Sequence, residues 1–179
     1  MKTFILFWNP AISSYKLDSY RDFLAEEPEY YDFNWSIWEH QKAHEGDRFF
    51  MVRCKNKPIP GQVNQWGKQV WEPCIDATTG ICMAGTFSSE PYQGEDWSGK
   101  GRETYYMDMW IDHASDPDKC VILSSEELSA AIPEFDWTGG HSGRMLDDAA
   151  AKKLEEMFAK AVEEKKDSIW TPEVRCFID

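Results

Sequence analysis

The chain has 179 residues, of which 42% are hydrophobic and 28% are charged, and its formal net charge is −13. This length and composition are typical of one globular domain that buries its own core. The negative charge argues against strong nonspecific nucleic-acid binding, because Lys and Arg supply most of that affinity. Aromatic residues reach 15%, with nine Trp. Since aromatic side chains dominate core packing, only those in loops beside polar partners are candidates for a functional role.

The five cysteines include no C-x-x-C pair, and no Cys and His cluster has the spacing of a zinc site. We therefore expect free thiols, no metal and no cofactor. The apolar run at the N-terminus is too short for a signal peptide, and no stretch approaches the roughly 18 apolar residues of a membrane span. These features predict a cytoplasmic protein that does not contact a membrane.

The first part of the chain is predicted to contain three strands and one helix. The apolar run at residues 4–8 indicates a strand, and apolar side chains at helical spacing predict a helix over residues 16–26. Alternation of aromatic and polar side chains at residues 31–37 predicts a half-buried strand. The next strand is expected at residues 48–54.

Residues 55–79 hold three Pro, two Gly and two Trp without a sustained period, so we expect a long loop there. Much of this segment belongs to a basic stretch. Between residues 48 and 71 the chain carries five cations and no acid, namely Arg48, Arg53, Lys55, Lys57 and Lys68. Either a local positive face or a solvated loop accounts for this pattern.

The second part of the chain is predicted to begin with strands at residues 80–88 and 104–112, joined by a polar, Gly-rich loop. A short helix is expected after Ser124, which has the character of an N-cap, and a longer amphipathic helix over about residues 147–165. The pattern contains no repeats. The whole chain, residues 1–179, is thus predicted to be one α+β domain.

Enzyme signatures are incomplete. The segment Gly140-His141-Ser142-Gly143 lacks the second glycine of a nucleophile elbow, because Arg144 stands in that place. His40 and His44 are four residues apart, but no zincin-type Glu accompanies them. Neither a Walker-type loop nor a dinucleotide-binding glycine motif occurs. No residue is therefore assigned a catalytic role.

Three segments carry a resemblance to a known superfamily. They are Phe7-Trp8-Asn9-Pro10, then Trp38 followed by Gly46-Asp47-Arg48-Phe49-Phe50-Met51-Val52-Arg53, then Gly80-Ile81-Cys82-Met83-Ala84-Gly85-Thr86-Phe87. In this order they resemble the PUA-like superfamily, most nearly its EVE, YTH and ASCH domains, over about residues 3–115. The resemblance implies a small curled β-sheet or pseudo-barrel flanked by helices. It also implies a nucleic-acid binder, often one that takes a modified base into an aromatic cage.

On this resemblance, we expect a non-catalytic domain that binds DNA or RNA. The base pocket is assigned to Trp8, Asn9, Trp38, Ser88, Tyr92 and Trp97. Phosphate binding is assigned to Arg53, Lys55, Lys57 and Arg102. A base would stack on the Trp and Tyr rings, at about 1–3 kcal/mol each, while Asn9 and Ser88 meet its edge. Either Trp35 or Trp38 is expected to pack in the core, because they face opposite sides of the predicted strand.

Two other functions remain open. One is an enzyme for a small polar substrate, with Asp96, Asp108 or His113 as acid and base groups, and it requires these groups to meet in one pocket. The other is an acidic module that binds a protein partner, such as a component of a defence-type system or a mimic of nucleic-acid charge.

Overall fold

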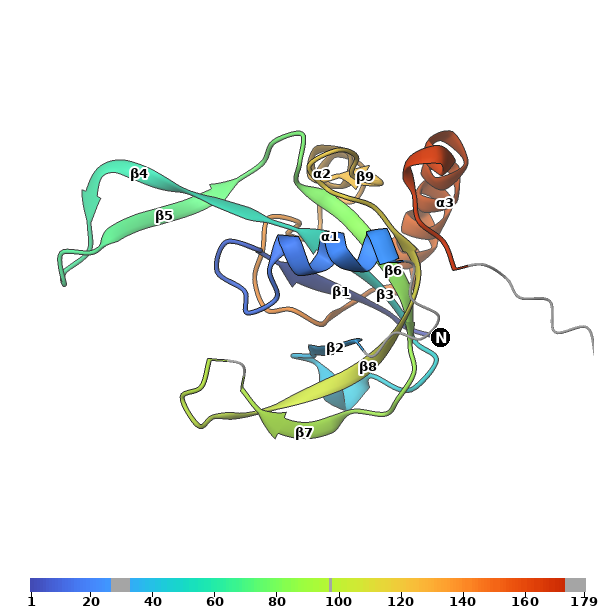
Figure 1. The fold of residues 1–179 in the computed structure, drawn as a ribbon, viewed down its shortest axis with the longest axis horizontal. Coiled ribbons are helices and arrows are strands. Elements are labelled where there is room, and N and C mark those ends of the chain that lie inside the picture. The colour runs from blue at the N-terminus through green and yellow to red at the C-terminus, as the bar shows by residue number, and fades with distance from the viewer. Residues whose placement is uncertain (27–32, 97, 173–179) are drawn as a thin grey trace, which may run out of the picture.

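The computed structural model describes residues 1–26, 33–96 and 98–172. Within these ranges the chain has an α+β fold in which a curled mixed sheet forms a half-barrel, with helices packed against it (Figure 1). The α+β class and the curled sheet expected from the sequence are therefore confirmed. Membership of the PUA-like superfamily stays a prediction.

The half-barrel is built from eight strands in the order β10-β1-β3-β6-β8-β2, with β7 paired to β8 and β9 paired to β6. Strands β1 and β3 are parallel, and the other pairs in this sheet are antiparallel. The bounds are β1 (Thr3–Trp8), β2 (Phe33–Ser36), β3 (Arg48–Arg53), β6 (Gly80–Phe87), β7 (Tyr92–Glu95), β8 (Glu103–Ala114), β9 (Leu123–Ser124) and β10 (Arg144–Leu146).

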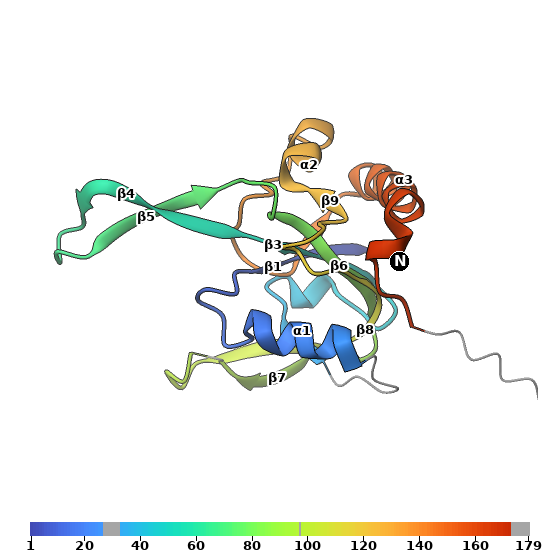
Figure 2. The same ribbon diagram turned by 45° about the horizontal axis from the view of Figure 1, so that its top comes forward.

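Helices cover both faces of this sheet. Helix α1 (Leu17–Glu26) lies on one side, and α2 (Ser125–Ala131) and α3 (Asp148–Lys165) lie on the other (Figure 2). Short 3₁₀ helices, η1 (His40–Lys42) and η2 (Lys166–Ser168), follow β2 and α3. The sequence accounts for α2, because Ser124 and Glu127 form a reciprocal capping box at its start. Within the described residues, no helix is both long enough and apolar enough to cross a membrane.

Strand β1 shows why the sheet needs both helical layers. Its side chains alternate between two hydrophobic cores, with Phe4 and Leu6 in the core that contains α1. Ile5 and Phe7 enter the other core, together with side chains of α2 and α3. A strand that is buried on both faces is apolar without alternation, which is the pattern that residues 4–8 show in the sequence.

The backbones of β6 and β8 approach each other closely at Gly85. The register of β6 against β8 shifts between Ala84 and Gly85. A Cβ atom on Gly85 would lie 1.9 Å from the carbonyl oxygen of Trp110 and 2.8 Å from the Phe49 ring. Glycine is therefore required where β8 bends across β6.

Residues 55–79 do not form the long loop that the sequence predicted. Most of them form a two-stranded hairpin of β4 (Lys55–Val63) and β5 (Gln69–Cys74), which is separate from the main sheet. We call this hairpin, residues 55–74, the arm. It projects away from the half-barrel in both ribbon views (Figures 1 and 2). The prediction was wrong because neither face of the arm packs on a core, so no alternation of apolar and polar residues marks its strands.

We predict that Gly85→Ala lowers the free energy of unfolding by about 3 kcal/mol or more, because the added methyl group meets backbone that cannot move independently. Urea denaturation followed by circular dichroism measures this change. Gly67→Ala is the control. Gly67 has a positive φ but no atom near its virtual Cβ, so it should lose only about 1–2 kcal/mol. Equal losses in the two variants would contradict the role given to Gly85.

Candidate functional site

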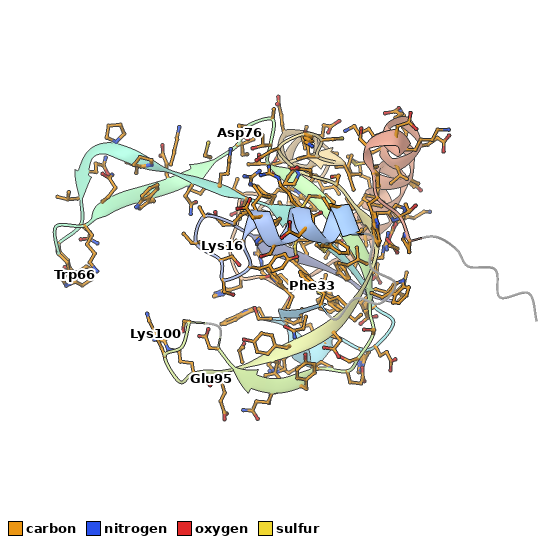
Figure 3. The ribbon with its side chains drawn as sticks, in the orientation of Figure 1. Lys16, Phe33, Trp66, Asp76, Glu95 and Lys100 are labelled. Carbon is orange, nitrogen blue, oxygen red and sulfur yellow. The ribbon has the colours of Figure 1, made fainter. Side chains whose placement is uncertain are left out.

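A groove of about 1060 Å³ opens where β1 ends, and it is the candidate site. Its lining is completed by residues 12–15, by β2, by side chains of β7 and β8, by the base of the arm and by the loop 136–142. Figure 3 places Phe33, one of the lining residues, inside the curl of the sheet. Seven aromatic side chains of the described residues line the groove: Phe7, Trp8, Tyr15, Phe33, Trp35, Tyr92 and Tyr106.

The aromatic wall of the groove is centred on Trp35. Its ring stacks on Phe33, with centroids 5.7 Å apart, and Tyr15 meets it edge-on at 6.4 Å. Trp8 lies beneath this cluster with only 1% of its surface exposed, and its indole Nε1 donates a hydrogen bond to the Tyr15 carbonyl. Trp8 therefore supports the wall, whereas the half-buried Trp35 presents surface to the groove.

The hydroxyl of Ser142 fixes the position of Trp35. Its Oγ atom accepts a hydrogen bond from the Phe7 backbone N–H at 2.9 Å and another from Trp35 Nε1 at 3.1 Å. A serine oxygen has two acceptor sites, so both are used, and its own proton is left to donate. Because Ser142 lines the groove, that proton is available to a ligand or to water.

Ser142 is held in place where the two ends of the sheet meet. The Gly143 N–H donates to the Ile5 carbonyl, while the carbonyls of Ser142 and Gly143 accept from Trp38 N–H and Glu39 N–H. Residues just before β10 are thereby bonded both to β1 and to the segment that follows β2. Gly143 has a φ of +90°, and a Cβ atom there would lie 2.6 Å from the Ile37 Cα. Only glycine fits at position 143, because any side chain would meet the Ile37 backbone.

Polar groups with defined roles lie around the aromatic wall. The Asn9 Oδ1 accepts from the Ala11 N–H, which leaves its amide nitrogen as a donor. Among the described residues, Asp136 is the one acid that lines the groove, and hydrogen bonds from the Thr138 hydroxyl and N–H lower the pKa of its carboxyl group. Burial raises the pKa of the Cys54 thiol to about 11, so it stays neutral. The described lining contains no Lys or Arg.

The structure brings three of the six predicted pocket residues to the groove. Trp8, Asn9 and Tyr92 line it, although Trp8 does so with very little exposed surface. Trp38 and Ser88 do not belong to its lining. Trp38 is 58% exposed and stacks on His141, with centroids 3.7 Å apart. The sixth residue, Trp97, lies outside the described residues.

Three important members of the lining were not assigned to the base pocket from the sequence, namely Trp35, Ser142 and Asp136. A signal for Trp35 was present, because it alternates with polar residues and shares the buried side of its strand with Phe33. Ser142 and Asp136 belong to a Gly-rich loop that is distant in sequence from β1 and β2. No local pattern indicated which strand ends this loop would contact.

The four predicted phosphate-binding cations have different surroundings. Arg53 is buried, and its guanidinium bonds to the Asp118 carboxylate at 2.9 Å, so it joins β3 to the loop before β9. Lys55 pairs with Asp76 at 2.9 Å, and Lys57 lies 3.5 Å from Glu72. Both lysines lie at the base of the arm, on the face opposite to the groove-lining Asn56 and Pro73. Arg102 is exposed on the loop between β7 and β8.

The acid and base groups of the enzyme alternative do not meet in the groove. Asp96, Asp108 and His113 are all absent from its lining. Asp108 accepts a 2.6 Å hydrogen bond from the Tyr92 hydroxyl, whereas His113 contacts Asp112 and the Phe158 ring of α3. In the part of the chain that the structure describes, no cluster of His, Cys, Asp and Glu could hold a metal ion.

No family model, curated protein or solved structure matches this chain.

We predict that Ser142→Ala destabilises the protein by about 1–3 kcal/mol for each donor left unpaired, because Phe7 N–H and Trp35 Nε1–H lose their shared acceptor. Urea denaturation measures the stability, and near-UV circular dichroism reports the release of the Trp35 ring. Ser14→Ala is a matched control, since Ser14 lines the groove on an exposed loop. Unchanged stability in Ser142→Ala would show that this hydroxyl does not organise the wall.

Proposed function

We propose that the protein binds nucleic acid, DNA or RNA, by taking one unpaired base into the groove, and that it does so in the cytoplasm without catalysing a reaction. Modified bases are included in this proposal. The observation that supports it best is the composition of the lining, whose described residues combine aromatic rings with polar groups and include no Lys or Arg. Such a lining suits a flat, uncharged, polar ring better than it suits a phosphate or a sugar acid.

Stacking would supply most of the binding free energy. The half-buried Trp35 and the exposed Tyr92 line the groove and offer rings to a base. Each base-aromatic contact is worth about 1–3 kcal/mol. Since the wall is already ordered by Ser142 and Tyr15, little side-chain entropy is lost when the base enters.

Polar groups of the lining would select the base by its edge. The Asn9 amide nitrogen and the Ser142 hydroxyl are donors, and the Asp136 carboxylate is an acceptor. Adenine and cytosine each present an exocyclic amine beside a ring nitrogen that accepts a hydrogen bond. The donor and acceptor set therefore favours these bases over uracil or thymine.

Cations for the flanking phosphates lie outside the groove. Lys55 and Lys57 lie at the base of the arm, on the face opposite to the groove-lining Asn56, and Arg102 lies on the loop after β7. Arg53 does not belong to this set, because its guanidinium is buried against Asp118. With so few phosphate contacts, affinity depends on the base more than on the backbone.

The other two functions have less support. The enzyme alternative needs acid and base groups in the groove, and its candidates lie elsewhere. The acidic protein-binding module has the net charge of −13 in its favour. That charge does not account for an aromatic groove, and the absence of any nucleoside binding would favour this alternative.

We predict that adenosine or cytidine, or one of their methylated or hydroxymethylated forms, binds saturably at low salt, as measured by isothermal titration calorimetry. Trp35→Leu should weaken this binding about tenfold or more, because a stacking ring is lost. Trp110→Leu is the matched control, since Trp110 is 50% exposed on β8 and does not line the groove. If no nucleoside and no oligonucleotide binds, the proposed function is wrong.

We predict that Asp136→Asn lowers the preference for amine-bearing bases over uridine by about tenfold, because a hydrogen bond to a charged acceptor is replaced by a weaker one. The measurement is the ratio of the dissociation constants for cytidine and uridine. Glu134→Gln removes a neighbouring charge that does not line the groove and serves as the control. An unchanged ratio would remove Asp136 from base selection.

A further inference from the structure

The face of the arm that borders the groove continues outward as a second binding surface. Antiparallel pairing places Asn56 opposite Pro73 and Pro58 opposite Trp71, and paired residues share a face. Asn56 and Pro73 both line the groove. Trp71 precedes Pro73 by two residues on β5, which runs from the tip of the arm to its base. Trp71 therefore lies on the same face, about 7 Å closer to the tip.

The arm exposes aromatic surface for which the fold gives no use. Trp71 is 58% exposed, and Trp66, at the tip of the arm in Figure 3, is 73% exposed. Neither residue belongs to the two hydrophobic cores. Large exposed aromatics gathered on a projecting element are typical of a binding surface.

The charge of the arm is opposite to that of the rest of the chain. Residues 55–74 contain Lys55, Lys57 and Lys68 but only one acid, Glu72, whereas the whole chain has a net charge of −13. Lys55 and Lys57 lie on the opposite face of the arm from Trp71. Their charge favours phosphates near the arm as a whole, while the Trp71 face offers the ring to a base.

The edges of the arm are less suited to pairing with a strand of another chain. Pro58 and Pro60 in β4, and Pro73 in β5, lack the backbone N–H that a β-ladder needs, and lysines lie along β4. A second copy of this chain that added a strand would therefore pair poorly. The face that bears Trp71 is the part of the arm that a ligand can use.

We infer that the ligand is a single-stranded oligonucleotide that runs from the groove along the arm, with the base next to the one in the groove stacked on Trp71. This inference rests on the proposed function and adds to it a length requirement. A duplex does not fit, because both bases must be unpaired to reach an aromatic face.

The test compares ligands of different length by isothermal titration calorimetry at low salt. The probes are adenosine and cytidine, and the single-stranded hexanucleotides of A and of C. The wild-type protein should bind at least one hexanucleotide about tenfold or more tightly than its nucleoside. Trp71→Ala should remove most of this gain without changing the affinity for the nucleoside. Trp110→Ala, on the half-barrel, should change neither value.

The outcomes separate the two proposals. If nucleosides bind but the hexanucleotide gains nothing, or if Trp71→Ala leaves the gain intact, the role of the arm is overturned and the base-binding groove stands. Tighter binding of the matching duplex than of the single strand would also overturn it. If neither nucleosides nor hexanucleotides bind, both proposals fail together.

Discussion

The groove depends on the meeting of the two ends of the curled sheet at Ser142 and Gly143. Backbone hydrogen bonds join these residues to β1 on one side and to Trp38 and Glu39 on the other. Because a Cβ atom at Gly143 would meet the Ile37 backbone at 2.6 Å, this contact has one geometry and cannot relax around a larger residue. Ser142 is therefore fixed relative to both edges of the sheet, and a rigid backbone holds the hydrogen-bonding group of the groove.

Support and recognition are divided between neighbouring tryptophans. Trp8 is fully packed, and its indole N–H is bonded to the Tyr15 carbonyl. It therefore gives the wall a rigid base, which lets Trp35 remain half-exposed without collapsing into the core. The same division applies to the arginines and lysines. Arg53 holds the loop before β9 in place, whereas Lys57 and Arg102 stay at the surface. Trp8 thus supports the exposed Trp35, whereas Arg53 has a structural role and leaves contact with solvent to other cations.

The sequence predicted the elements that bury apolar side chains and missed those that do not. Strands β1, β3 and β6, and helices α1 and α3, were recognised because their burial leaves a continuous or periodic apolar pattern. The arm has no buried face and therefore left no such pattern. Trp38 was misplaced for a related reason. Strand β2 ends at Ser36, so alternation no longer decides which way residue 38 points. Ser142 reaches the groove through contacts with Phe7, 135 positions away in sequence, which local propensity does not encode.

An acidic protein can bind nucleic acid when the charge is unevenly distributed. Repulsion from a surface of net charge −13 disfavours contact with phosphates over most of the molecule. It is screened beyond roughly 8–10 Å at physiological ionic strength, so its effect is local. The part of the groove lining that the structure describes has one carboxylate, and the adjoining arm has three lysines against one acid. A nucleic-acid strand would thus be repelled from most of the half-barrel and tolerated along the groove and the arm. Under the proposed function, the acidic surface suppresses nonspecific binding, and stacking in the groove supplies the affinity that remains.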